Sequence, residues 1–520
     1  MRRRGALVAL VALAVGLLVR GTAPFAAAAA ERDEVRILAG EPATFDPAGQ
    51  GDITTAAVTA QIHETLTIYD AARQIQPALA SSWDVAADGR EVVFHLRPGL
   101  TFSDGTALTA EDVVGSWLRL IDPDSPSPLA ALMIDVKGAR AHLLRQSTDP
   151  AEVGLRASDL DVQVELERPG ADFPAIVSAP IFAVVPPAVW RDGRDAFGPD
   201  QPVSGGYEVA SVSSNEIVLQ RNERYWAGPP AIPTVRLVLD IGGRSPVAAF
   251  ESDDIDYTSV SSVDAPWIPY DPGLGPDLRE TSSLDLTYLA LDTTRAPFDD
   301  VRVRQAFGAA VDWQRVVTLS STGGIVAARS MVPPGIPGGG DRSWLPAHDP
   351  EHARELLAEA GYPGGAGLPQ IEFGTGGYPV AAAIAADLQR ELGMHVEQVV
   401  YDDHLGRIST APPNFWITGW IADYVGPNDF LGVLLESDSN DNNGRWSSAA
   451  FDQAVADALS SRDPAAAQAA YERALGEIQD EVPVVPLYHS TSWSLARDGL
   501  LGAGDNGLGI LRMAGMAWAE

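Results

Sequence analysis

The residues best suited to binding chemistry are an aspartate and a tyrosine that follow an apolar run. Phe415–Trp420 reads as an apolar strand, Asp423 and Tyr424 come next, and the turn Gly426-Pro427 closes the segment. Ligands of open α/β sheets bind at the carboxyl ends of strands, where this carboxylate would lie. A buried carboxylate there would hold a ligand ammonium through a charge-assisted hydrogen bond. The alternative is that Asp423 only caps the turn.

Motifs that would mark an enzyme are missing from the sequence. It contains no G-x-S-x-G, H-E-x-x-H or G-x-x-x-x-G-K-[ST] pattern. The acidic loop Asp438–Gly444 is calcium-like at a glance, but its glycine stands at the seventh position and the twelfth residue is Ala449. Paired carboxylates arise by chance among 70 acidic residues. We therefore expect no catalytic residue, no metal site and no cofactor.

The charge balance of the chain excludes one class of partner. Its 520 residues include 70 Asp and Glu against 36 Lys and Arg, a formal charge of −34, and Lys137 is the one lysine in the sequence. Nucleic acid is not an expected partner, because binding it needs a cationic surface. The absence of cysteine excludes disulfides, thiolate zinc sites and a cysteine-linked lipid.

The first thirty residues have the order of a secretory signal. Three arginines at positions 2–4 precede the apolar run Ala6–Val19, and small residues at 26–30 precede Glu31. This run is shorter than the roughly 20 residues that span a bilayer. We expect residues 1–30 to be a signal peptide, and the protein to be exported to the periplasm or cell surface and not to be a lipoprotein. A signal that remains as an anchor is the alternative.

Short strand-like runs alternate with helical patterns along the remainder, as in an α/β protein. A capping box at Thr109–Asp112 starts one helix. The expected strands are Val35–Leu38, Glu91–Arg97, Ile217–Gln220, Thr234–Leu239 and His395–Val400, and the expected further helices are Pro350–Ala360, Val380–Leu392 and a run from Pro464 to about Gln479. The sequence has no short fixed repeat, so these elements should pack together rather than form a solenoid.

Three groups of segments carry a specific resemblance. The first is Gln76–Asp84, Asp88–Arg97, Phe102–Asp112 and Ser116-Trp117; the second is Gly205–Tyr207 with Leu219–Trp226; the third is Ala296–Ala306, Val311-Asp312, Glu355–Tyr362 and Gly419–Tyr424. In order and spacing they resemble the dipeptide- and oligopeptide-binding proteins, the extracellular substrate-binding family 5 of ABC importers. The resemblance covers essentially the whole chain after residue 30.

The fold that this resemblance implies is α/β and bilobal, the periplasmic-binding-protein type II fold with an extra subdomain on lobe one. Lobe one would comprise residues 31–53, 182–280 and 490–520, the extra subdomain 54–181, and lobe two 281–489. Two crossovers between the lobes would then form a hinge, and closure about it would trap the ligand.

The resemblance also implies a binding site. Asp423 matches the acidic residue that captures a peptide's α-amino group, and the backbone around Trp420 and Glu41 would pair with the peptide main chain as an added strand. The expected ligand-binding residues are Glu41, Trp420, Ile421, Ala422, Asp423 and Tyr424. Leu129 and Ile417 replace an aromatic and a basic residue of the oligopeptide-binding members, so no partner for a ligand carboxylate is assigned.

The expected function is therefore capture of oligopeptides or dipeptides in a cleft and their delivery to the permease of an ABC importer. The protein is expected to be a monomer without covalent chemistry. Two alternatives remain from the sequence. The same fold could bind a nickel chelate, an oligosaccharide or haem, as relatives in the family do, or the chain could be a secreted hydrolase using paired carboxylates.

Overall fold

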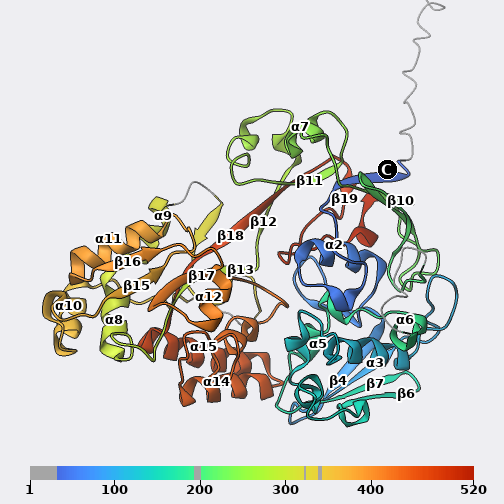
Figure 1. Ribbon diagram of the computed structural model, residues 1–520. Coiled ribbons are helices and arrows are strands. Elements are labelled where there is room, and N and C mark those ends of the chain that lie inside the picture. The colour runs from blue at the N-terminus through green and yellow to red at the C-terminus, as the bar shows by residue number, and fades with distance from the viewer. Residues whose placement is uncertain (1–31, 193–200, 321–323, 338–341, 520) are drawn as a thin grey trace, which may run out of the picture.

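The computed structural model describes residues 32–192, 201–320, 324–337 and 342–519. The expected signal peptide, residues 1–30, lies outside the described residues. Within them, no helix combines the length and apolar character needed to cross a membrane. The chain forms two large α/β bodies side by side, joined at the top of the view by long strands (Figure 1).

A mixed sheet of twelve strands runs through both bodies, and its longest strand is β18 (Val484–Ala496). The first half of β18 pairs with β13 and β14, and its second half pairs with β11 and β12. The strand order is β16-β15-β17-β13-β18-β11-β1-β10-β9-β8. The bounds are β1 Glu34–Leu38, β8 Tyr207–Val212, β9 Glu216–Arg221, β10 Thr234–Val238, β11 Tyr257–Val260, β12 Leu278–Ser282, β13 Asp285–Leu291, β14 Ile325–Ala327, β15 Ile371–Gly374, β16 Val396–Val399 and β17 Phe415–Ile421.

Helices cover both faces of the left half of this sheet. Along β17, Phe415 and Ile417 point into one apolar core and Trp416 into the other, because successive side chains of a strand face opposite sides. The first core is shared with α8 (Val301–Ala310), α9 (Trp313–Ser320), α10 (Pro350–Glu359) and α11 (Ala381–Leu392), and the second with α13 (Gly432–Leu435), α14 (Ala449–Ser460) and α15 (Pro464–Glu481). The strand is therefore held firmly up to its carboxyl end. Helix α12 (His404–Thr410) lies beside it (Figure 1).

The lower right part of Figure 1 holds a second sheet with the order β4-β5-β7-β6. Its strands are β4 Ala80–Val85, β5 Glu91–Leu96, β6 Leu155–Ser158 and β7 Asp161–Glu165. Helix α3 (Ala110–Leu118) packs on it through Trp117, whose ring meets Phe94 edge-on at 6.2 Å. The expected capping box starts this helix, with Thr109 N donating to Asp112 at 2.8 Å.

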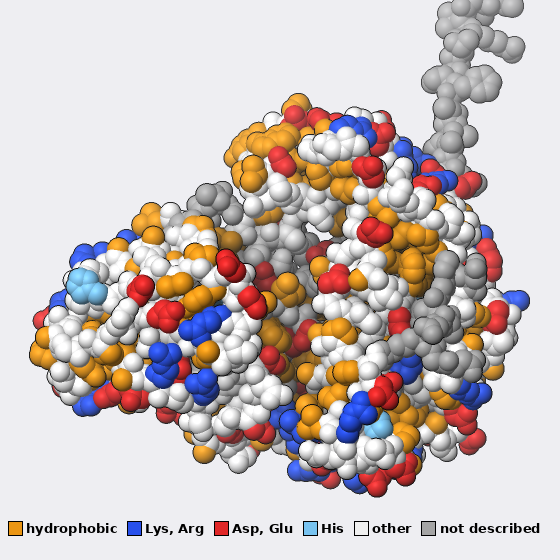
Figure 2. Space-filling view, in the orientation of Figure 1, with side chains coloured by type: hydrophobic (Ala, Val, Ile, Leu, Met, Phe, Trp, Pro, Cys, Tyr) orange, Lys and Arg blue, Asp and Glu red, His pale blue; other side chains and the backbone are white. Residues whose placement is uncertain are grey.

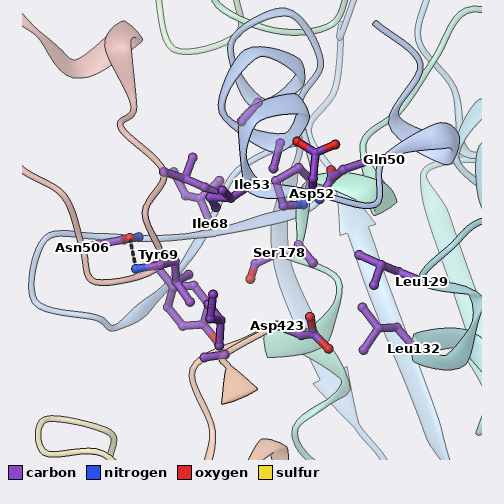
Figure 3. A pocket seen from close by; sticks show the side chains of 18 of the residues that line it. Gln50, Asp52, Ile53, Ile68, Tyr69, Leu129, Leu132, Ser178, Asp423 and Asn506 are labelled. Atoms are coloured by element: carbon purple, nitrogen blue, oxygen red, sulfur yellow. Dashed lines mark hydrogen bonds between the residues drawn. The ribbon is translucent and has the colours of Figure 1, made fainter. Parts of the chain in front are cut away.

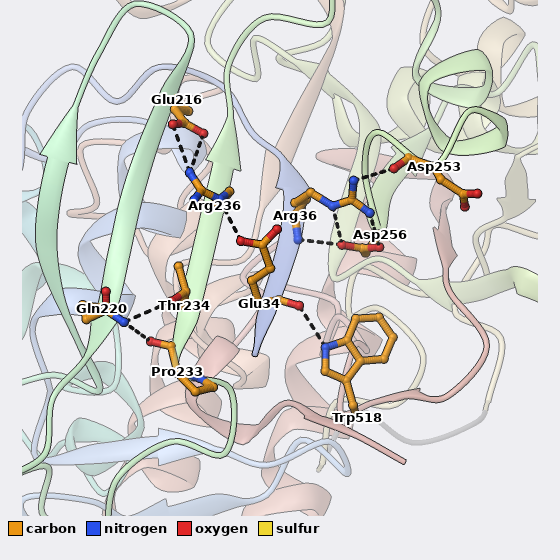
Figure 4. A network of polar contacts seen from close by, with 10 residues as sticks. All are labelled: Glu34, Arg36, Glu216, Gln220, Pro233, Thr234, Arg236, Asp253, Asp256 and Trp518. Carbon is orange, nitrogen blue, oxygen red and sulfur yellow. Dashed lines mark hydrogen bonds and ion pairs between the residues drawn. The ribbon is translucent and has the colours of Figure 1, made fainter. Parts of the chain in front are cut away.

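The remaining elements complete the right half. They are α2 Ile53–Ile62, α4 Ala139–Leu143, α5 Phe173–Ile176, α6 Pro187–Asp192, α7 Pro246–Glu251, the hairpin of β2 (Thr67–Tyr69) and β3 (Ile75–Pro77), and the pair β19 (Leu500–Leu501) and β20 (Ala517–Trp518). Ion pairs tie strand β1 to its neighbours (Figure 4): Arg36 contacts Asp256 at 3.0 Å, and Arg236 contacts Glu34 at 2.9 Å.

The elements expected from the sequence agree with the structure to within about two residues at each end. The α/β class is thereby confirmed, as are the strands at 35–38, 91–97, 217–220, 234–239 and 395–400 and the three helices after residue 349. These segments have strong local signals, a cap or a turn residue at each boundary.

Candidate functional site

A cavity of about 290 Å³ opens between the two bodies. Its wall comes from segments far apart in the sequence, at 50–69, 129–132, 178–180, 421–423 and 506–512. Figure 2 shows the hollow between the bodies, with hydrophobic side chains on its walls. Much of the lining is apolar: Ile53, Leu129, Leu132, Ile421, Leu508 and Ile510. Small-molecule sites commonly have such an apolar wall with a few polar groups, and volumes of about 300–1,000 Å³.

Asp423 places a carboxylate in this cavity. It follows the carboxyl end of β17, its side chain is half-buried, and in Figure 3 it lies across from Ser178 and Leu132. No side chain in the described part of the chain makes an ion pair or hydrogen bond with the Asp423 carboxylate. Gln50 also lines the cavity, and its buried Oε1 has no hydrogen-bond partner. The cavity therefore presents hydrogen-bond acceptors that lack a donor. An ammonium group would supply one.

A second carboxylate, Asp429, lies directly behind Asp423. It is fully buried, and its Oδ2 accepts hydrogen bonds from Trp420 Nε1 at 3.1 Å and from the backbone N of Asp423 at 3.2 Å. Burial and the neighbouring Asp423 charge raise the pKa of Asp429 well above its ordinary value. Burial and the charge of Asp441 raise the pKa of Asp423 to about 6. Burial therefore favours the protonated form at Asp429, and of the two carboxylates Asp423 more readily carries the negative charge.

This arrangement predicts a pH dependence for binding any solute with an ammonium group. Only ionised Asp423 attracts the ammonium, and protons compete for it below its pKa of about 6. Affinity should therefore be greatest near pH 7 and fall as the pH drops, to about tenfold weaker at pH 5. Isothermal titration calorimetry between pH 5 and pH 8 checks this. The Asp423→Asn variant should give a flatter profile, and an unchanged slope would count against the assignment.

The segment that carries Asp423 is fixed to the opposite body by two tyrosines. Tyr69 OH donates to Val425 O at 3.2 Å and accepts from Val425 N at 3.1 Å. Tyr424 OH donates to Asp172 Oδ2 at 2.8 Å and accepts from Asn428 Nδ2 at 3.1 Å. Because all four bonds involve buried or part-buried groups, the Asp423 carboxylate is held in position before a ligand arrives.

The strand edge next to Asp423 has no partner strand among the described residues, and His404 Nε2 contacts it at Ile417 O, at 2.8 Å. The register of β17 with β15 ends at Trp416, whereas its register with β13 continues to Ile421. Gly419 and Ile421 are exposed. An unpaired edge of this kind can accept a further strand through main-chain hydrogen bonds.

The structure brings three of the six sequence-predicted site residues into the cavity wall: Ile421, Ala422 and Asp423. Trp420 is half-buried beside it and bonds Asp429, and Tyr424 is buried and faces a neighbouring cavity. Glu41 is exposed in the coil after β1, outside this wall. Sequence reasoning missed Tyr69, Ser178 and Arg512, which no local motif marks.

Arg512 is a cation in the cavity wall, but its charge is already matched. Its Nη2 lies 2.9 and 2.8 Å from the two carboxylate oxygens of Glu64, which is 1% exposed. Tyr225 OH donates to the same carboxylate at 2.5 Å. A ligand carboxylate would have to compete with Glu64 for this arginine, so the cavity favours a cationic or apolar group over an anionic one.

Comparisons with known proteins identify relatives of this chain. Residues 74–442 match the sequence model of the bacterial extracellular solute-binding proteins, family 5 Middle. The chain is 29% identical to the periplasmic oligopeptide-binding protein OppA of Salmonella typhimurium, covering 89% of this chain and 88% of OppA. It is 28% identical to the probable deoxycholate-binding periplasmic protein YgiS of Escherichia coli, covering 86% of each.

The fold is also that of solved relatives. The unliganded open form of MppA, the periplasmic murein tripeptide-binding protein of Escherichia coli, superposes with a TM-score of 0.81 at 25% identity, covering 94% of this chain and 98% of MppA. The expectation of the family 5 periplasmic-binding fold is confirmed. The expectation that the protein is a transport component and not an enzyme is confirmed with it. The chain belongs to the bacterial extracellular solute-binding proteins, family 5.

Proposed function

We propose that this solute-binding protein captures peptides with a free α-amino group between its two bodies and delivers them to the membrane permease of an ABC importer. One observation carries the proposal: the unpaired Asp423 carboxylate stands at the end of the open edge of β17. The carboxylate would hold the ammonium, and the strand edge would pair with the peptide main chain. Main-chain pairing does not read side chains, so several sequences would be accepted.

The proposed ligand-binding set is Glu41, Trp420, Ile421, Ala422, Asp423 and Tyr424. Within it, Tyr424 would act through its bond to Asp172 rather than by touching the solute, because its hydroxyl is already engaged. Glu41 would join the site only if closure brought the coil after β1 towards the ligand. The permease is implied by family membership, and the names of OppA and MppA support peptides as the solute class.

The proposed domain division follows the sequence ranges given above. Between β12 and β13 the chain passes from the right half of the sheet to the left, and β18 passes back at residues 488–491. We propose that these two stretches are the hinge about which residues 281–489 close on the remainder.

Export to the periplasm or cell surface is proposed from the pattern of residues 1–30 and from the periplasmic relatives.

A second candidate is favoured by the apolar wall. An amphipathic solute that is not a peptide could fill the space beside Ile53, Leu129 and Ile510, and YgiS carries the name of a deoxycholate-binding protein. The negative charge of Asp423 disfavours an anionic solute of this kind, because the solute carboxylate would lie in the same cavity and be repelled.

The test is thermal shift of the purified protein with three probes: trialanine, N-acetyl-trialanine and deoxycholate. A ligand that binds only the folded state stabilises it by about 2.7 kcal/mol at a hundredfold excess over Kd. Trialanine should raise Tm and N-acetyl-trialanine should not. A shift with deoxycholate alone would favour the second candidate and overturn the peptide proposal. Mass spectrometry of solute that co-purifies with the protein would then name the ligand.

A further inference from the structure

A second cavity, of about 450 Å³, adjoins the first between the same two bodies. Leu132 lines both cavities, and Tyr424 of the second follows Asp423 of the first in the chain. One wall comes from residues 131–146 with 167–168, and the other comes from residues 428–441 after β17. A solute held at Asp423 therefore has this space directly beside its bound end.

The charged groups of the second cavity are mainly acidic. They are Asp135, Glu167, Glu436, Asp438 and Asp441 against Arg140 and Arg168. Arg168 lies between two of the acids, 2.8 Å from Asp135 and 2.5 Å from Glu436, so its charge is more than balanced. Asp441 is half-buried, and its carboxylate has no ion pair or hydrogen bond with the rest of the described chain.

A residue of this cavity's wall also has a buried acceptor without a partner. Asn428 is 5% exposed, and its Nδ2 donates to Tyr424 OH, which itself donates to Asp172. That chain of bonds leaves Asn428 Oδ1 as a free acceptor, and it has no partner in the described structure. Leaving a buried acceptor unpaired destabilises the folded state, and an N–H donor from a solute would relieve this.

Gly432 makes room for this acceptor. A Cβ at this position would lie 2.1 Å from Asn428 Oδ1, closer than atoms can pack, and 3.1 Å from Glu436 Oε2, which is a tight contact. A side chain here would push against both acceptors. The wall thus presents an amide oxygen and carboxylates towards the cavity, and all of them accept hydrogen bonds.

We propose that the second cavity binds a second positive charge of the solute, the side chain of a lysine or arginine at the first position of the peptide. The α-ammonium would lie at Asp423, and the side-chain cation would reach Asn428 Oδ1 and the Asp441 carboxylate. This inference rests on the proposed peptide-binding function and adds to it a preference at one position. It gives a role to Asp441. This residue lies in the acidic loop Asp438–Gly444, which takes no part in binding the α-amino group.

The test compares three peptides by calorimetry at pH 7.5: Lys-Ala-Ala, norleucine-Ala-Ala and Ala-Lys-Ala. Norleucine has the lysine stem without its charge. Lys-Ala-Ala should bind about tenfold more tightly than norleucine-Ala-Ala, since hydrogen bonds to charged groups are the strong ones. In Asp441→Asn this preference should disappear, while norleucine-Ala-Ala should still bind and so report a folded site.

The matched control is Glu351→Gln, which removes one negative charge from exposed α10, outside both cavities. It should keep the preference for Lys-Ala-Ala. Ala-Lys-Ala should lose no more affinity in Asp441→Asn than norleucine-Ala-Ala does, because its side-chain charge lies at the second position. Equal binding of Lys-Ala-Ala and norleucine-Ala-Ala, or a preference that survives in Asp441→Asn, overturns this inference alone. Failure of all three peptides to bind overturns the proposed function together with it.

Discussion

Replacing Asp423 by asparagine is expected to weaken the binding of free-amino peptides by roughly 30-fold to several thousand-fold. The variant keeps the size of the side chain and removes its charge, so the ligand ammonium would enter the cavity without an opposite charge. Truncating one partner of a buried, hydrogen-bonded charge pair costs about 2–5 kcal/mol, and each 1.4 kcal/mol is a factor of ten in Kd. Calorimetry with trialanine at pH 7.5 measures the effect.

The neighbouring carboxylate supplies the control for this substitution. Burial and the Asp423 charge favour the protonated form of Asp429, and its Oδ2 accepts from Trp420 Nε1, so Asp429→Asn supplies a neutral group of the same shape at the same place. It should leave affinity within a fewfold of the native protein. If Asp429→Asn were as damaging as Asp423→Asn, the charge that holds the ligand would not belong to Asp423. Unchanged binding in Asp423→Asn would remove the basis of the proposed function.

The position of Asp423 was predictable because the signals that place it are local. Phe415–Trp420 alternates between two cores, so a strand is required there, and the Gly426-Pro427 turn shows where it must stop. A carboxylate in the interval between strand and turn lies at the carboxyl end of that strand, however the rest of the chain folds. The whole strand β17 and the capped helix α3 follow from the same kind of reasoning.

The walls around Asp423 were not predictable from the sequence alone. Tyr69 reaches Val425 across 356 positions of the chain, and Arg512 reaches Glu64 across 448. Such contacts depend on how the two bodies dock, and no periodicity or cap encodes that. Asp429 shows the same limit. It stands in an ordinary Gly-Pro-Asn-Asp turn sequence, and only its complete burial beneath Trp420 reveals that its pKa is raised well above the ordinary value.

Replacing Arg512 by methionine is expected to cost about 3–5 kcal/mol of unfolding free energy, because it leaves the carboxylate of Glu64 buried without an opposite charge. Glu64 is 1% exposed, and its carboxylate accepts hydrogen bonds from Arg512, from Tyr225 OH and from the backbone N of Thr65. The pair joins the end of α2 to the C-terminal segment 506–512, so its loss should loosen one wall of the binding cavity. Thermal and denaturant unfolding without ligand measure the change.

Two comparisons separate the buried charge from a general loss of packing. Adding Glu64→Gln to Arg512→Met removes the unpaired charge and keeps an acceptor for Tyr225 OH, so the double variant should recover much of the lost stability. The matched single variant Arg473→Met breaks the exposed pair with Asp457, whose side chains are 55% and 46% exposed, and should change stability little. If Arg512→Met and Arg473→Met lowered the unfolding free energy by equally small amounts, the Glu64 carboxylate would have to be in contact with water in the native protein. The cavity wall beside α2 would then be more open than the hydrogen bonds of Glu64 indicate.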